Sequence, residues 1–155
     1  MQKAIIYLYS YHHINTQKIG NAIAKKINAK IIELKDKNDP NELETYDLIG
    51  FGAGIDSGKH YPQMLKFAIN LQNVNHKKTF IFSTSGLYSG KKMIKDHKTL
   101  RKILEDKGFI IIGEFGCKGF NTNSILKYFG GINKGCPNNE DIIRAEKFGE
   151  NLINE

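Results

Sequence analysis

A turn rich in hydrogen-bonding side chains separates the first apolar run of the chain, residues 4–8, from an amphipathic helical pattern over residues 15–28. The side chains of this turn that can bond to an anion are Ser10, His12, His13, Asn15 and Thr16. The free N–H groups at the start of the helix and the positive end of its dipole add to that attraction. The pattern therefore predicts a binding site for a phosphate group.

The predicted phosphate site does not belong to the best-known nucleotide-binding classes. The chain has no Gly-x-Gly-x-x-Gly and no Gly-Lys-Ser/Thr pattern, which argues against a dinucleotide fold and a nucleoside triphosphatase. A serine hydrolase is disfavoured because no Gly-x-Ser-x-Gly elbow occurs. A phosphoacceptor receiver domain would need clustered carboxylates where the chain has Tyr7 to Ser10. His60, His76 and His97 lack the spacing of metal ligands, so we expect them at the surface and predict no metal site.

Two further segments, residues 50–61 and residues 83–90, are rich in glycine or in small polar residues. The glycines of the first segment are Gly50, Gly52, Gly54 and Gly58. Glycine allows tight turns or the close approach of a ligand to the backbone. We interpret the two segments as loops that hold a flat heteroaromatic ring against exposed peptide groups. The alternative is that they are ordinary connecting loops.

The elements that must position these segments are strands that alternate with helices. Apolar runs predict five strands, over residues 4–8, 31–34, 48–52, 79–83 and 109–113. Helical patterns cover residues 15–28 and 95–107, a further helix starts near Pro62, and the last follows Pro137 with Asn138 as its N-cap. Continuously apolar strands indicate a parallel sheet covered on both faces, so we predict a three-layer doubly wound α/β/α sandwich. Its ligand would lie outside the carboxyl ends of the first, third and fourth strands.

Length, cysteine content and charge narrow the class of protein. A chain of 155 residues fits one domain, residues 1–155, and no apolar run approaches the roughly 18 residues of a membrane span. The first strand begins too close to Met1 for a signal peptide, and Cys117 and Cys136 form no Cys-x-x-Cys pair. We therefore expect a cytoplasmic protein with buried or half-buried thiols. The net charge of +7 is dispersed, which argues against nucleic-acid binding and favours acidic protein partners.

Five segments, taken in order, resemble the flavodoxin family, whose domains bind flavin mononucleotide (FMN). They are residues 15–19 (Asn-Thr-Gln-Lys-Ile), 50–55 (Gly-Phe-Gly-Ala-Gly-Ile), 80–86, 113–120 and 130–135, the last of them before Pro137. The resemblance covers essentially the whole chain and implies FMN as the cofactor and a strand order of 2-1-3-4-5. The chain departs from the best-known flavodoxins in two respects. His12-His13-Ile14 stands where they have Thr, Ser and Gly, and the chain is basic where they are acidic.

The resemblance also implies which segment holds which part of the cofactor. The phosphate would be bound by Ser10, His12, His13, Asn15 and Thr16. One side of the isoalloxazine ring would face Ala53, Gly54, Ile55 and Asp56, and the other side would face Thr84, Ser85, Gly86 and Tyr88. A peptide group within residues 54–58 would hydrogen-bond to the reduced ring and so shift its potential.

The expected function is that of a low-potential electron carrier between redox proteins, which needs FMN and no catalytic side chain. The alternative is a small FMN-dependent reductase or oxidase that acts on a quinone or a porphyrinogen. That alternative is favoured if residues 114–136, an unusually long connection that we interpret as a lid or a partner surface, build a pocket over the ring. A related domain that has lost its cofactor is a third alternative. The chain could be a monomer or a dimer.

Overall fold

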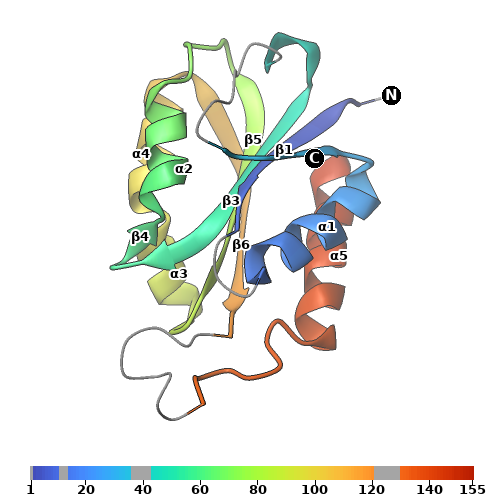
Figure 1. Cartoon of the computed structure of the whole chain (residues 1–155). Coiled ribbons are helices and arrows are strands. Elements are labelled where there is room, and N and C mark those ends of the chain that lie inside the picture. Colours follow the sequence, from blue (N-terminus) through green and yellow to red (C-terminus); the bar gives the residue numbers. More distant parts are fainter. Residues whose placement is uncertain (1, 11–13, 36–42, 121–129) are drawn as a thin grey trace.

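Strands and helices alternate along the chain in the computed structural model, which describes residues 2–10, 14–35, 43–120 and 130–155 (Figure 1). The strands are β1 (Ala4–Tyr9), β2 (Lys30–Glu33), β3 (Leu48–Asp56), β4 (Lys59–His60), β5 (Lys77–Ser85) and β6 (Phe109–Lys118). The helices are α1 (Asn15–Ile27), α2 (Pro62–Ile69), α3 (Gly90–Asp96), α4 (Lys98–Asp106) and α5 (Asn139–Ile153), and a single 3₁₀ turn, η1, covers Leu43–Thr45.

The main sheet is parallel and has the order β2-β1-β3-β5-β6. With the short β4 set aside, this is the 2-1-3-4-5 order that the resemblance implied, and the α/β class is confirmed. The prediction of five strands was one short, because β4 pairs antiparallel with the end of β3. Ser57 and Gly58 lie between these two strands with φ angles of 53° and 79°. Two consecutive residues with positive φ are typical of a tight hairpin turn.

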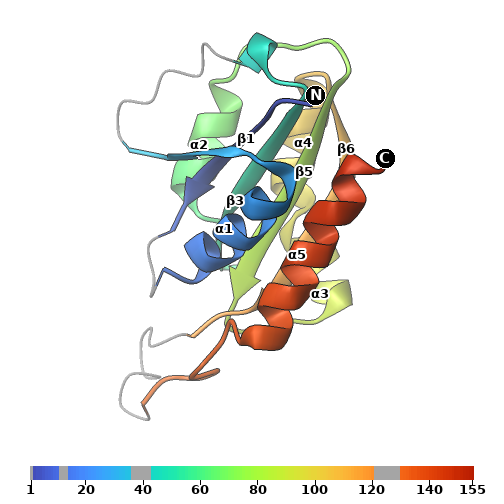
Figure 2. The same cartoon turned by 90° about the vertical axis from the view of Figure 1, so that its right-hand side faces the viewer.

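The sheet is covered on both faces (Figure 2). Ile6 and Leu8 of β1 pack with α1 and α5 in one core cluster, whereas Ile5 and Tyr7 of the same strand pack with α2 and α4 in the other. This alternation follows from the two-residue period of a strand. The result is the three-layer sandwich predicted above, with α1 beside α5 on one face.

The strands β3, β5 and β6 continue four, two and five residues beyond their predicted ends, so the connection expected to start at residue 114 starts after Lys118. Gly50 and Gly52, at the start of the segment interpreted as a loop, lie inside β3. These glycines make room for aromatic rings on the neighbouring strand. A Cβ atom at Gly50 would lie 2.2 Å from the ring of Phe80, and one at Gly52 would lie 2.1 Å from the ring of Phe82. Their role is therefore packing in the core.

The helices begin largely where their capping residues predict. Pro62 occupies the first turn of α2, and Asn138 caps α5 by exchanging hydrogen bonds with Asp141 in a capping box. The helix predicted over residues 95–107 is in fact two helices, α3 and α4, which meet at His97. Within the described ranges, no helix combines the length and apolar character needed to cross a bilayer.

Candidate functional site

The carboxyl ends of β1, β3 and β5 lie side by side at one edge of the sheet. Tyr9 pairs with Ala53 and Gly54 pairs with Thr84 across these strands. The side chains of Thr84 and of Thr16, at the start of α1, meet with 2.8 Å between their hydroxyl oxygens. The structure therefore brings together the start of α1 and the ends of β3 and β5. His12 and His13 lie outside the described residues.

The start of α1 leaves its backbone N–H groups largely available. Ile14 occupies the N-cap position with a left-handed φ of 51°, and its own side chain makes no capping hydrogen bond. The first turn has no acidic residue, and the Ser10 Oγ accepts one hydrogen bond, at 3.3 Å, from the N–H of Gln17. A positive φ is strained at a β-branched residue, and strain of this kind gathers at ligand sites. This end of α1 can bind an anion.

Asn15, at the start of α1, has a buried polar atom that lacks a hydrogen-bond partner among the described residues. Its buried side chain donates from Nδ2 to the carbonyl oxygen of Phe120 at 2.8 Å. Its Oδ1 is buried and has no hydrogen-bond partner within the described residues. Gly119 packs against the same amide, because a Cβ atom there would lie 2.7 Å from Nδ2. A buried carbonyl oxygen without a donor is costly, so this atom suits a ligand that brings a hydroxyl group.

The predicted first wall of the ring site, Ala53 to Asp56, is the last part of β3 and becomes more exposed toward the hairpin. The expectation that it is a loop was wrong, because its small residues continue the hydrogen bonds of the strand. Gly54 makes room for Tyr61, whose ring would lie 2.5 Å from a Cβ atom at that position. The N–H of Tyr61 also donates to the carbonyl oxygen of Gly54 at 3.1 Å. The hairpin thereby folds back beside the wall.

The predicted second wall begins inside β5, with Thr84 and Ser85, and continues into the β5–α3 loop, residues 86–89. Leu87 is 69% exposed in this loop. Asn133, from the long connection after β6, donates from Nδ2 to the carbonyl oxygen of Gly86 at 2.6 Å. A cavity of about 420 Å³ lies between the two segments and is lined by Gly86, Leu87, Tyr88, Ser89, Lys92, Lys118, Ile132 and Asn133. No residue of β3 lines this cavity, so it lies beside the two walls and not between them.

Residues 6–150 match a protein family described as flavodoxin domain (Flavodoxin_3). The chain belongs to this flavodoxin domain family.

This flavodoxin is 48% identical over 151 residues to the uncharacterized protein MJ0298 of Methanocaldococcus jannaschii, a match that covers 97% of this chain and 98% of that protein. It is similar to oxidised flavodoxin 1 from Bacillus cereus, with a TM-score of 0.72 and 18% identity over 98% of each chain. It is also similar to a flavoprotein from Lactobacillus acidophilus in complex with FMN, with a TM-score of 0.57, 17% identity, and coverage of 75% of this chain and 93% of that one. The two structural matches show a shared fold.

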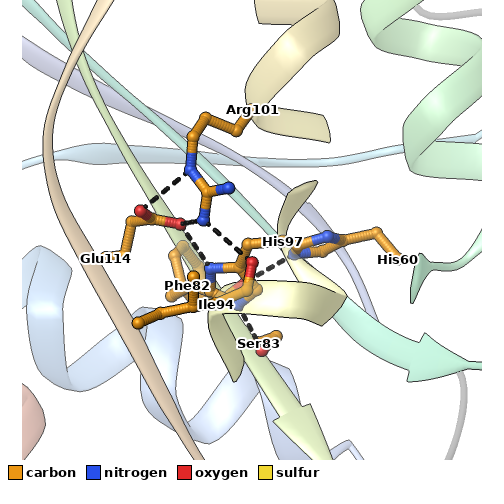
Figure 3. A network of polar contacts seen from close by, with 7 residues as sticks. All are labelled: His60, Phe82, Ser83, Ile94, His97, Arg101 and Glu114. Carbon is orange, nitrogen blue, oxygen red and sulfur yellow. Dashed lines mark hydrogen bonds and ion pairs between the residues drawn. The ribbon is translucent and has the colours of Figure 1, made fainter. Parts of the chain in front are cut away.

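The flavodoxin also holds a buried polar network that the sequence did not reveal (Figure 3). Its members are His60, Ser83, His97, Arg101 and Glu114. Neither histidine has exposed surface, so the expectation of a surface position was wrong for His60 and His97, whereas His76 is exposed. His60 turns inward because the hairpin returns over the sheet, and both ring nitrogens of His97 find polar partners. The sequence carried a single hint, a carboxylate at position 114 in an otherwise apolar strand.

Charge and burial fix the protonation of two members of the network. Burial raises the pKa of Glu114, but hydrogen bonds from His97 and Arg101 outweigh that effect and lower this pKa to about 2. Burial also lowers the pKa of His60 to about 3, and the nearness of His97 adds to the shift. At neutral pH, Glu114 is therefore ionised and His60 is neutral.

The two cysteines of this flavodoxin are free thiols, Cys117 buried and Cys136 half-buried, as predicted. Burial raises the pKa of the Cys117 thiol far above its usual range. Because the thiolate is the reactive form, Cys117 is a packing residue and not a nucleophile.

Proposed function

We propose that this flavodoxin binds FMN and carries electrons between redox proteins. FMN is the ligand of the related flavoprotein from Lactobacillus acidophilus, which supports the choice of cofactor. The observation that carries the proposal is the start of α1. There the N-cap residue makes no capping hydrogen bond, and the buried Asn15 Oδ1 lacks a donor among the described residues. When bound, FMN would supply the one-electron and two-electron chemistry that side chains lack.

The residues at the start of α1 fit the phosphate and ribityl end of FMN. The Ser10 hydroxyl uses its oxygen to accept from Gln17, so its proton is free for a phosphate oxygen. Thr16, His12 and His13 are the further phosphate ligands proposed from the sequence. A doubly ionised phosphate has no proton to give to the Asn15 Oδ1, whereas the ribityl chain has several hydroxyl groups. We therefore assign Asn15 to the ribityl chain, in place of the phosphate to which the resemblance assigned it.

The ring would lie between the two walls described above. The proposed ring-binding residues are Ala53, Gly54, Ile55 and Asp56 on one side and Thr84, Ser85, Gly86 and Tyr88 on the other. Ile55 and Tyr88 are half-buried, so each keeps apolar surface available to pack on a ring. The ends of β3 and β5 would also present backbone groups to the polar edge of the ring, which would tune its potential.

The visible absorption spectrum of the purified protein, before and after addition of FMN, tests this proposal directly. Flavin bands followed by anaerobic reduction in two separate one-electron steps support a carrier. A protein that binds no flavin even after reconstitution contradicts the proposal. The variant Asn15→Leu should weaken FMN binding about tenfold, the value of one lost hydrogen bond. Asn21→Leu, at an exposed position of the same helix, is the matched control and should bind FMN as the wild type does.

A second candidate function is that of an FMN-dependent reductase or oxidase acting on a quinone or a porphyrinogen. The observation that favours it is the cavity beside the β5–α3 loop, whose 420 Å³ is within the range of small-molecule sites. Leu87, Tyr88 and Ile132 give it apolar surface for an aromatic substrate. Steady turnover of a quinone with a reduced nicotinamide cofactor would favour this enzyme, and a carrier should show little.

A basic rim around the proposed ring site favours acidic partners. Exposed lysines there are Lys59 on β4, Lys91 and Lys95 on α3, and Lys118 at the end of β6. Electron transfer to an acidic redox protein should slow as salt is added, because steering by surface charge is screened. The variant Lys95→Glu should also slow this electron transfer. Lys3→Glu, at the opposite edge of the sheet, is the control and should leave the rate unchanged.

A further inference from the structure

The β3–β4 hairpin, residues 55–60, is anchored to the core by one buried side chain. His60 pairs with Ile55 across the hairpin and donates from Nε2 to the carbonyl oxygen of Phe82 in β5 at 3.3 Å. Its ring lies 4.8 Å, centroid to centroid, from the ring of His97 (Figure 3). The position of the proposed first wall therefore depends on how His60 is seated.

His97 anchors the other wall. Its Nε2 lies 2.7 Å from the hydroxyl oxygen of Ser83, and its Nδ1 lies 2.9 Å from a carboxylate oxygen of Glu114. Arg101 holds the same carboxylate with two hydrogen bonds, of 2.6 and 3.1 Å. Since His97 joins α3 to α4, these bonds fix α3, and α3 carries the β5–α3 loop at its start. The two histidines thus link segments that lie on opposite sides of the proposed ring.

The hydrogen-bond partners of the two rings differ. Both ring nitrogens of His97 face polar groups, the Ser83 hydroxyl and a carboxylate oxygen of Glu114. The buried Nδ1 of His60 has no partner within the part of the chain that the structure describes, so a proton added there would find no acceptor. Arg101 of α4 and Glu114 of β6 are the charged groups that face His60, and the titratable ring of His97 faces it as well. The Lys92–Asp96 ion pair of α3 lies next to the hairpin turn at Gly58.

We propose that His60 and His97 are positioning residues that hold the β3–β4 hairpin and the β5–α3 loop at a fixed separation around the flavin ring. The inference rests on the proposed binding of FMN. Neither residue touches the flavin in this proposal; each acts through the wall that it anchors. A second consequence is that acid releases the flavin, because a protonated His60 leaves its buried position and the hairpin opens.

The first test compares the dissociation constants of FMN and riboflavin for the full chain and its variants. Riboflavin has the ring without the phosphate, so a defect in the walls should weaken both ligands by the same factor. We expect that factor to be at least about tenfold for His60→Ala. His60→Gln keeps an N–H donor for the Phe82 carbonyl and should restore binding to within about threefold of the wild type.

Two control variants separate positioning from phosphate binding and from general stability. Ser10→Ala should weaken FMN and leave riboflavin unchanged, because the Ser10 hydroxyl is assigned to the phosphate and bonds to the N–H of Gln17 and not to either wall. Leu48→Ala removes a buried side chain at the amino end of β3 and, while circular dichroism shows it folded, should leave both constants unchanged. His60→Ala that is folded and binds both flavins as the wild type does would overturn the inference. A wild type that binds neither flavin would instead overturn the proposed function.

The second test follows the rate of riboflavin release against pH. An imidazole exposed by opening titrates near its ordinary pKa of about 6.5, so the open hairpin gains about 25-fold in population between about pH 7 and pH 5. Release from the wild type should quicken by that factor, and release from His60→Gln should not. Equal pH profiles for the two proteins would contradict the proposed opening.

Discussion

Acid should destabilise this protein through one buried imidazole, and the size of the effect can be worked out. His60 is fully buried, and its Nδ1 has no hydrogen-bond partner among the described residues. Burial, with the nearby His97, lowers the pKa of His60 to about 3, whereas an unfolded chain titrates near about 6.5. Below about pH 6.5 the unfolded state therefore binds a proton that the folded state does not bind. The free energy of unfolding must fall as the pH falls between these two values.

The expected loss is about 2 kcal/mol between about pH 7 and pH 5, since each further pH unit below the unfolded pKa costs about 1.4 kcal/mol. Typical domains have only about 5–15 kcal/mol of stability, so the effect is large enough to measure. The variant His60→Gln cannot titrate in this range and still offers a donor to the Phe82 carbonyl. At any one pH, the free energy of unfolding of His60→Gln can be higher or lower than that of the wild type, because the prediction concerns only how this free energy changes with pH.

The assay is urea unfolding of the flavin-free protein at a series of pH values, for the wild type, His60→Gln and His76→Gln. The wild-type free energy of unfolding should fall by about 2 kcal/mol more than that of His60→Gln between about pH 7 and pH 5. His76 is exposed, and its variant should keep the wild-type slope. Parallel curves for the wild type and His60→Gln would refute the reasoning.

Three further perturbations test the packing, the capping and the ion pair. Gly52→Ala would place a Cβ atom 2.1 Å from the Phe82 ring and should cost about 1–3 kcal/mol in denaturant unfolding, whereas Gly90→Ala, with open space around it, should cost little. Ser89→Ala removes the hydroxyl that caps α3 and should cost about 1 kcal/mol in thermal unfolding. Glu114→Gln should lose stability at neutral pH, where the carboxylate is ionised. The pKa of Glu114 is about 2 in the folded protein. The difference in the free energy of unfolding between Glu114→Gln and the wild type should therefore shrink as the pH falls below about 4.5.

The three layers were predictable from the residues because the information for them is local, whereas the strand order followed from the resemblance to the flavodoxin family. The strands of the main sheet have apolar runs at their centres, and the starts of α2 and α5 carry a proline and a capping asparagine. The strand ends were not predictable in the same way. Residues such as Ala53, Gly54, Thr84 and Ser85 are small or polar, so the apolar pattern stops while the hydrogen bonds of the sheet continue. The errors therefore gather at the carboxyl edge, where the proposed site lies.

The buried network lies beyond any local pattern. His60, Ser83, His97 and Glu114 come from β4, β5, the α3–α4 junction and β6, and they meet only when the sheet is assembled. A histidine next to a lysine, or between an aspartate and a lysine, looks like a surface residue. Such a histidine is buried because another element supplies its hydrogen-bond partner, and no spacing along the chain predicts that partner.

The four glycines of residues 50–58 show how packing and ligand binding can share one sequence signal. Gly50, Gly52 and Gly54 make room for the rings of Phe80, Phe82 and Tyr61, each from another part of the chain. Gly58 differs, because it has a positive φ in the hairpin turn and no close neighbour. A peptide group that turns to face a reduced flavin needs that kind of freedom. We therefore assign the proposed tuning of the potential to the turn at Ser57 and Gly58. A shifted potential in a Gly54 variant would instead report a displaced Tyr61.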